Sequence, residues 1–321
     1  MVLNGKEMKK NKIPAILKLI KEYKPQEMDY SYQKSISYTS FSTFQQCGKK
    51  WSLMYKDGHY ESSFSINMSF GSAIHNTVQH YLTLMYEQSG AEADRLDIED
   101  YFQTQFTQAY KADFEKNNNK HFSNPGEMRE FFDDGINILT QLKQHKNKYF
   151  SKRDWYLVGC EIPILITPYK PFKNVVYKGY IDLVLYHEKT NKFVIYDLKT
   201  SKGSWGDYQK KDEIKIAQLL LYKHFFSQQF NIPIEDIDIE FFILKRKLPE
   251  ENPYYLKHIQ QFNPPSGKNK VGKAITALEN FIKECFDENG LKEKEHEAKP
   301  SEYGCKYCVF SGKKDLCSKG L

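Results

Sequence analysis

Residues 175–226 constrain the fold more than any other stretch, because they place polar residues at fixed positions on three predicted elements. Residues 178–186 and 193–199 are short runs rich in β-branched and aromatic side chains, which predicts two strands joined by a turn at residues 187–191. A helix is predicted from about residue 212 to residue 228. The stretch should therefore form an antiparallel hairpin followed by a helix that packs against the sheet.

The second strand carries Asp197 and Lys199, which point to the same face because side chains two apart on a strand do so. Leu198 packs behind them, and Asp182 on the partner strand can lie alongside. Two carboxylates and the Leu198 carbonyl offer the hard oxygen ligands that Mg²⁺ or Mn²⁺ prefers. The Lys199 ammonium can orient or help deprotonate a water molecule and neutralise charge on a phosphate.

Gln218 and Tyr222 are four residues apart in the predicted helix, so both face the sheet and its polar cluster. The plainer alternative is a solvated hairpin in which Asp197 and Lys199 form a surface pair worth roughly 0–1 kcal/mol.

Three motifs in this order resemble the PD-(D/E)XK nuclease superfamily and, within it, the RecB-like branch. They are G-x-x-D at residues 179–182, D-x-K at residues 197–199 and Q-x-x-x-Y at residues 218–222. The resemblance covers about residues 37–317. It implies an α/β, restriction-endonuclease-like core with a mixed central sheet flanked by helices. It also implies metal-dependent hydrolysis of DNA by a catalytic set at Asp182, Asp197, Lys199, Gln218 and Tyr222.

His75 lies on or beside the apolar stripe of a helix predicted over residues 71–85, where a lone histidine is usually a core residue. The resemblance favours a different role, because RecB-like nucleases carry G-x-x-x-H here and Gly71 and His75 match. It implies that His75 binds the catalytic metal together with Asp182, Asp197 and the Leu198 carbonyl. An imidazole ligand shifts the preference somewhat toward Mn²⁺. Glu161, on a strand predicted over residues 155–167, is either a further carboxylate of this site or an outward-facing charge.

Six cysteines are too few for a disulfide scaffold in a chain of 321 residues. Cys305, Cys308 and Cys317 have the spacing of metal ligands and leave one ligand position vacant. Cys47 can fill it. It lies on a helix predicted to start near Ser40 or Ser42 and to carry Phe44, Cys47, Trp51 and Tyr55 on one face. Cys160 and Cys285 have no partner by spacing and are expected to be structural.

RecB-like nucleases of the AddB type and CRISPR-associated adaptation nucleases hold a 4Fe-4S cluster with one N-terminal and three C-terminal cysteines. The resemblance therefore implies an iron-sulfur cluster at Cys47, Cys305, Cys308 and Cys317 that staples the two ends of the domain. Two features depart from that pattern: Gly48 replaces a frequent proline, and the interval between Cys308 and Cys317 is longer than usual. Zinc at the same cysteines, or a set of free thiols, are the alternatives.

The chain is expected to form an N-terminal extension and one domain. Residues 1–35 are basic and polar, which predicts a loosely attached helix or extension. Residues 36–321 form the nuclease domain, with a helical insertion at about 90–150, a catalytic core at 155–247 and a C-terminal helix and cysteine cluster at 270–321. A strand predicted over residues 236–247 ends in Lys245, Arg246 and Lys247, which either clamp a backbone phosphate or form a solvated strand end.

The net charge of +6, from 47 basic and 41 acidic residues, is compatible with a polyanionic partner such as DNA. No apolar run approaches the ~20 residues of a membrane span, and the N-terminus is too charged for a signal peptide, so a cytoplasmic protein is expected. No helicase motif is present, so any unwinding must come from a partner chain.

Three functions remain open. The first is a DNA nuclease, an exonuclease or end-processing enzyme, acting in recombination, repair, phage replication or CRISPR adaptation. The others are a non-catalytic DNA-end-binding module and a zinc-stabilised nucleic-acid or protein-interaction domain.

Overall fold

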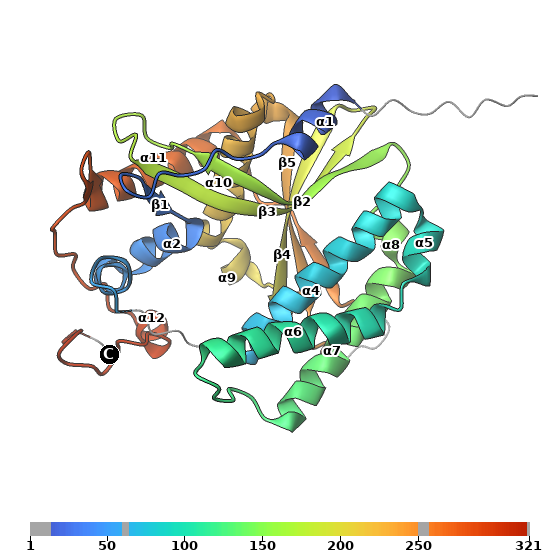
Figure 1. Ribbon diagram of the computed structural model, residues 1–321, viewed down its shortest axis with the longest axis horizontal. Coiled ribbons are helices and arrows are strands. Elements are labelled where there is room, and N and C mark those ends of the chain that lie inside the picture. Colours follow the sequence, from blue (N-terminus) through green and yellow to red (C-terminus); the bar gives the residue numbers. More distant parts are fainter. Residues whose placement is uncertain (1–13, 60–63, 250–256, 320–321) are drawn as a thin grey trace, which may run out of the picture.

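The computed structural model describes residues 14–59, 64–249 and 257–319, which fold around one mixed β-sheet (Figure 1). The strands are β1 (Lys34–Ile36), β2 (Trp155–Ile166), β3 (Val175–His187), β4 (Lys192–Ser201), β5 (Ile237–Lys245), β6 (Ile259–Phe262), β7 (Phe286–Asp287) and β8 (Gly290–Leu291). The α-helices are α1 (Ala15–Glu22), α2 (Tyr38–Gln46), α3 (Gly48–Trp51), α4 (Ile66–Thr83), α5 (Gly90–Arg95), α6 (Ile98–Lys116), α7 (Pro125–Gln144), α8 (Lys146–Tyr149), α9 (Asp207–Lys210), α10 (Glu213–Phe230), α11 (Lys268–Cys285) and α12 (Glu302–Lys306). Short π and 3₁₀ segments are η1 (Ser52–Lys56), η2 (Leu84–Gln88) and η3 (Ile234–Asp236).

The main sheet has the strand order β1-β3-β4-β5-β6, and β2 also pairs with β3. β3 is parallel to β1 and antiparallel to β2 and β4, whereas β4 is parallel to β5. The predicted hairpin is present, with its turn between His187 and Lys192. Both the α/β class and the mixed sheet between helices are therefore confirmed.

β4 is covered on both faces, which explains its nearly continuous apolar sequence. Phe193 and Ile195 belong to the core shared with α10, α11, α1 and α2. Val194, Tyr196 and Leu198 belong to a second core shared with α4, α6 and α7. Figure 1 shows these two groups of helices on opposite sides of the sheet. Polar residues on β4 therefore lie between two apolar layers.

α10 forms the crossover that a parallel β4–β5 pair requires. Its first turn is capped by Asp212, whose side chain accepts hydrogen bonds from the backbone amides of Ile214 and Lys215. It ends at Asn231, which has the left-handed φ of 52° common at helix C-termini. The helix is buried along much of its length, so its polar residues are held rigidly against the sheet.

The helices on the other side of the sheet include the region expected as a helical insertion. α7 begins with Asn124 as its cap and Pro125 in its first turn. In the part of the chain that the structure describes, no helix is long and apolar enough to cross a membrane.

The N-terminal region differs from its prediction. Residues 1–13 lie outside the described residues, but α1 is not loosely attached, because Leu17 and Ile20 are buried in the core. β1 crosses the end of the predicted extension and pairs with β3. The amphipathic spacing of α1 therefore reflects a packing face rather than a free helix.

The continuous helix expected around Cys47 is also wrong. α2 ends at Gln46, Cys47 is extended with φ −160° and ψ 113°, and α3 starts at Gly48. A Cβ at residue 48 would lie 2.9 Å from the Cβ of His296, so the chain approaches another segment closely here. The turn takes Cys47 off the face that carries Trp51.

Candidate active site

Asp182 and Asp197 lie where β3 and β4 separate. The β3–β4 ladder runs from the turn to Leu183 and Tyr196 and stops one position before the two aspartates. Beyond this point β4 continues its pairing with β5. The amide of Leu198 donates a hydrogen bond to Asp182 Oδ2 at 2.7 Å, so the carboxylate bridges the gap between the strands.

Asp197 and Lys199 form an ion pair on one face of β4, as the strand period predicts, with Asp197 buried and Lys199 half-buried. Lys199 Nζ lies 2.7 Å from Asp197 Oδ2, and the Asp197 side chain is only 2% exposed. Apart from this ion pair, Asp197 Oδ2 has no hydrogen-bond partner among the described residues. A solvated surface pair is therefore not what this hairpin contains.

The electrostatics of the cluster follow from burial. Burial raises the pKa of Asp182 well above its ordinary range, and the Asp197 charge raises it further. Burial also raises the pKa of Asp197, which Lys199 partly offsets. Burial by itself would lower the pKa of Lys199, but the charges of Asp197 and Asp182 outweigh it, so that pKa is raised. The carboxylates of Asp182 and Asp197 are thus both stabilised by the single Lys199 ammonium, in a cluster with little access to water.

His75 reaches the cluster from α4, which covers the face of the sheet opposite to α10. Its Nδ1 lies 3.9 Å from Asp182 Oδ2, and the ring is hydrogen-bonded to the Leu198 backbone. Burial and the nearby Lys199 charge lower the pKa of His75 to about 4. The imidazole is therefore neutral at pH 7, the form in which histidine binds metals.

Gln218 and Tyr222 reach the cluster from α10, as their spacing predicts. Lys199 Nζ donates a hydrogen bond to Gln218 Oε1 at 3.1 Å, and Tyr222 is hydrogen-bonded to Gln218. Gly179 makes room for the phenol ring, because a Cβ at this position would lie 3.0 Å from Tyr222 Cε1. Packing against Tyr222 therefore explains why a glycine occupies the first position of the G-x-x-D motif.

Glu161 lies opposite Asp182 and is held by Gln79, a residue that none of the sequence motifs includes. Gln79 Nε2 donates hydrogen bonds to Glu161 Oε1 at 2.7 Å and to the Asp182 carbonyl at 2.8 Å. The Glu161 charge contributes to the raised pKa of Asp182. The one sequence signal for Gln79 is its place four residues after His75, which puts both on one helix face.

Tyr38, the first residue of α2, is a second residue that the sequence did not indicate. Its hydroxyl donates a hydrogen bond to the Ile214 carbonyl at 2.8 Å. Burial raises the pKa of Tyr38, and the charges of Asp197 and Asp212 add to the effect. Tyr38 therefore fastens α2 to the first turn of α10, close enough to Asp197 to feel its charge.

A divalent cation suits this donor set. Within the described residues, no three His, Cys, Asp or Glu side chains are already gathered closely enough to hold a metal ion. The cluster nevertheless offers the buried Asp197 carboxylate, the half-buried Asp182 carboxylate, a neutral imidazole and the Leu198 backbone, with Asp197 Oδ2 lacking a hydrogen-bond donor other than Lys199. Hard oxygen donors with a deficit of positive charge are the usual environment of Mg²⁺ or Mn²⁺.

The four cysteines expected as cluster ligands line one cavity of about 860 Å³, between α3, α9 and the C-terminal tail. In the described residues none of them forms a disulfide, and no three of them are gathered at metal-ligand distances. The backbone amide of Lys299 lies 3.4 Å from Cys47 Sγ. Figure 1 shows the tail with α12 beside the segment that carries α2. The chain thus brings its distant cysteines to one place without forming a closed ligand cage.

Cys160 and Cys285 lie elsewhere. Burial raises the pKa of Cys160 to about 12, and Cys285 is buried with its Sγ 3.7 Å from His296 Nε2. Both environments keep a thiol protonated, as expected for structural cysteines.

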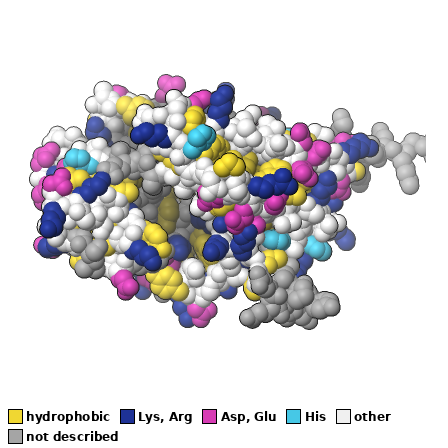
Figure 2. Space-filling view, turned by 90° about the horizontal axis from the view of Figure 1, so that it is seen from below, with side chains coloured by type: hydrophobic (Ala, Val, Ile, Leu, Met, Phe, Trp, Pro, Cys, Tyr) yellow, Lys and Arg dark blue, Asp and Glu magenta, His cyan; other side chains and the backbone are white. Residues whose placement is uncertain are grey.

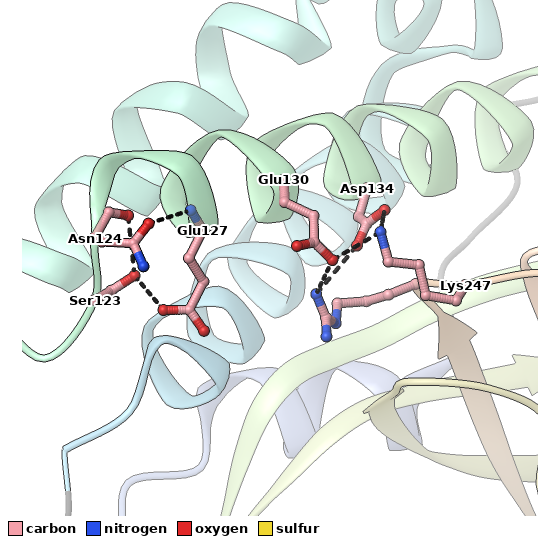
Figure 3. Close-up of polar contacts among 7 residues, drawn as sticks. Ser123, Asn124, Glu127, Glu130, Asp134 and Lys247 are labelled. Carbon is pink, nitrogen blue, oxygen red and sulfur yellow. Dashed lines mark hydrogen bonds and ion pairs between the residues drawn. The ribbon is translucent and has the colours of Figure 1, made fainter.

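The cations at the end of β5 are not available as a phosphate clamp, and two of them are paired with acidic groups. Arg246 and Lys247 contact Asp134 of α7 at 3.1 and 2.9 Å, and Glu130 lies beside them (Figure 3). Lys245 is buried and donates a hydrogen bond to Ser204. Neither the clamp nor the solvated strand end describes these residues, which anchor α7 to the sheet.

The underside of the molecule is hollowed near its middle, with lysine or arginine side chains beside the hollow (Figure 2). The hollow lies between the side that carries α2 and α12 and the side that carries α4, α6 and α7. A recess with a cationic rim is suited to a polyanion.

Comparison with known proteins agrees with this geometry. A search of curated proteins found no match to the sequence. The family model of the PD-(D/E)XK nuclease superfamily matches residues 35–313, which include β2 to β8, the helices from α2 to α12 and the carboxylate cluster. The chain belongs to the PD-(D/E)XK nuclease superfamily.

Proposed function

We propose that this chain is a Mg²⁺- or Mn²⁺-dependent deoxyribonuclease of the RecB-like branch that processes DNA ends. The observation that carries the proposal is the buried Asp197, which shares a single ammonium with Asp182. Burial disfavours the ionised form of both carboxylates, so the pair does not stabilise the fold by itself. The same two groups are suitable oxygen ligands for a divalent cation. Recombination, repair, phage replication and CRISPR adaptation are the settings in which such an activity is used.

In this proposal His75, Asp182, Asp197 and the Leu198 carbonyl hold the cation. A bound divalent ion would act as a Lewis acid toward a phosphate oxygen and would lower the pKa of a water molecule. The lowered pKa of His75 leaves its nitrogen free for a metal at neutral pH, which favours Mn²⁺ alongside Mg²⁺.

We assign to Lys199 the role of contacting the attacking water molecule and the scissile phosphate. Its raised pKa keeps it cationic at neutral pH, so it orients a water molecule and offsets negative charge that develops on the phosphate. The hydrogen bond to Gln218 fixes the ammonium in place, and Tyr222 supports Gln218. Glu161 adds negative charge at the edge of the same cluster.

We also propose that Cys47, Cys305, Cys308 and Cys317 bind a 4Fe-4S cluster, with zinc as the rival. Support comes from their position around one cavity, although they would have to move closer together to share a metal centre. Anaerobic purification followed by iron and zinc analysis distinguishes the two. Six cysteines that form no disulfide also suit a reducing, cytoplasmic setting.

The decisive experiment for the nuclease is digestion of end-labelled single-stranded and duplex DNA in Mg²⁺ and Mn²⁺. Asp197→Asn and Lys199→Met should each abolish cleavage, whereas Lys189→Met, in the exposed β3–β4 turn, should cleave like the unmodified protein. Cleavage at undiminished rates by either site variant would reject the assignment. DNA binding without cleavage by the unmodified protein in Mn²⁺ would favour a non-catalytic end-binding module.

A further inference from the structure

Glu161 has an unusual backbone at the position that faces Asp182. The β2–β3 ladder pairs Cys160 with Leu183 and Ile162 with Ile181, so Glu161 and Asp182 are opposite each other where the ladder is interrupted. Glu161 has φ 51°, in the left-handed region. That conformation costs a non-glycine residue about 1–2 kcal/mol and persists only where neighbouring groups hold it.

Gln79 is the neighbour that holds Glu161. Its side-chain nitrogen donates two hydrogen bonds at the break in the β2–β3 ladder, one to Glu161 Oε1 on β2 and one to the Asp182 carbonyl on β3. Gln79 is only 7% exposed, whereas Glu161 is exposed. The buried Gln79 amide therefore donates a hydrogen bond to the Glu161 carboxylate, although this exposed carboxylate can be hydrated by water.

The strand register sets Glu161 directly across from a second acidic residue, Asp182. Like charges directly across a strand pair destabilise a sheet, and an exposed glutamate released from Gln79 would relieve the repulsion by turning toward solvent. The amide therefore maintains a concentration of negative charge at the edge of the proposed cation site. A divalent cation is the ligand that such a set of oxygens suits.

We propose that Gln79 is a positioning residue that keeps the Glu161 carboxylate directed toward Asp182, so that Glu161 takes part in holding the divalent cation. The inference rests on the metal site of the proposed function. It adds to that site one carboxylate from β2 and one amide from α4, four residues after His75 on the same helix face.

A double-mutant cycle tests the inference through Mn²⁺ binding, measured by the electron paramagnetic resonance of free Mn²⁺ without DNA. Gln79→Met keeps the shape of the side chain and removes the donor, and Glu161→Gln removes the charge. Each should weaken Mn²⁺ binding by about 10-fold, and the double variant should be no weaker than Glu161→Gln. Losses that multiply, or a Gln79→Met protein with undiminished affinity, would overturn the inference.

Controls separate this inference from the metal site itself. Gln105→Met removes another side-chain hydrogen bond to α4, that with Asn76, and should leave Mn²⁺ binding unchanged. Asp197→Asn should lose Mn²⁺ binding. If it does not, the proposed function fails; if it does while Gln79→Met binds normally, only the role of Gln79 fails. Should Gln79→Met not fold, Gln79→Asn, whose amide is too short for both acceptors, carries the same expectation.

Discussion

Lys199 Nζ donates a hydrogen bond to Gln218 Oε1 across 3.1 Å, which ties the ammonium on β4 to the middle of α10. The same ammonium contacts Asp197, so its position is fixed from the sheet and from the helix. A cationic group restrained on two sides keeps its orientation when a charged substrate arrives, which is the condition for electrostatic stabilisation of a transition state.

The first prediction concerns that hydrogen bond. Gln218→Met should lower kcat for DNA cleavage by about 10- to 100-fold with little change in KM, because it frees the ammonium without removing a charge. Gln228→Met, at an exposed position of the same helix, is the matched control and should leave both constants unchanged. A rise in KM alone would show that Gln218 acts in DNA binding instead.

A second prediction concerns the space beside Tyr222. Gly179→Ala should lower stability by about 1–3 kcal/mol, because the new methyl group would press on the rings of Tyr222 and Tyr177. Thermal unfolding measures the loss. Adding Tyr222→Leu should restore much of the stability but not the cleavage activity. Gly272→Ala, in α11 with no atom near the new methyl group, should instead stabilise by up to ~1 kcal/mol.

A third prediction concerns pH. The pKa values of Asp182 and Asp197 are raised above the ordinary 3.8, and a cation binds their ionised forms. Metal affinity should therefore rise with pH above 3.8, and binding should release protons. His75, with a pKa of about 4, is already neutral over most of that range and adds little. Calorimetry in buffers of different ionisation enthalpy counts the protons, and no proton release at any pH above 3.8 would contradict the expectation.

A fourth prediction concerns the anchor between α7 and β5. Asp134→Ala should lower the free energy of unfolding by about 3–5 kcal/mol, because it leaves the partly buried Arg246 without its nearest carboxylate. Arg246 also lies 3.5 Å from the centre of the Phe131 ring, which prevents it from simply turning to solvent. Asp133→Ala breaks an exposed pair with Arg129 on the same helix and should cost less than about 0.5 kcal/mol. Equal shifts in Tm would contradict the assignment.

Local patterns predicted the elements of the cluster because those elements carry their own signals. β3 and β4 have strong β-forming runs, α10 has its cap at Asp212, and the two-residue and four-residue spacings place Asp197, Lys199, Gln218 and Tyr222 on shared faces. Placement of these groups together follows from the structure, whereas their catalytic roles remain predictions.

Other features depend on contacts that no local pattern carries. Three residues of β1 are too few for a periodic signal, and the end of α2 at Gln46 follows from the close approach of the His296 segment to Gly48. Arg246 and Lys247 looked available because Asp134 is more than a hundred positions away in the chain. Gln79 was missed for the same reason, since its two acceptors lie on strands that follow much later.

β4 lies in the interior of the sheet, hydrogen-bonded to β3 on one edge and to β5 on the other. It carries Asp197 and Lys199, and the Leu198 amide of the same strand holds Asp182. Amide protons of such a strand should be among the last in the chain to exchange, because they open only when the whole sheet does. Heat inactivation should then coincide with global unfolding instead of preceding it as a separate, lower-temperature event.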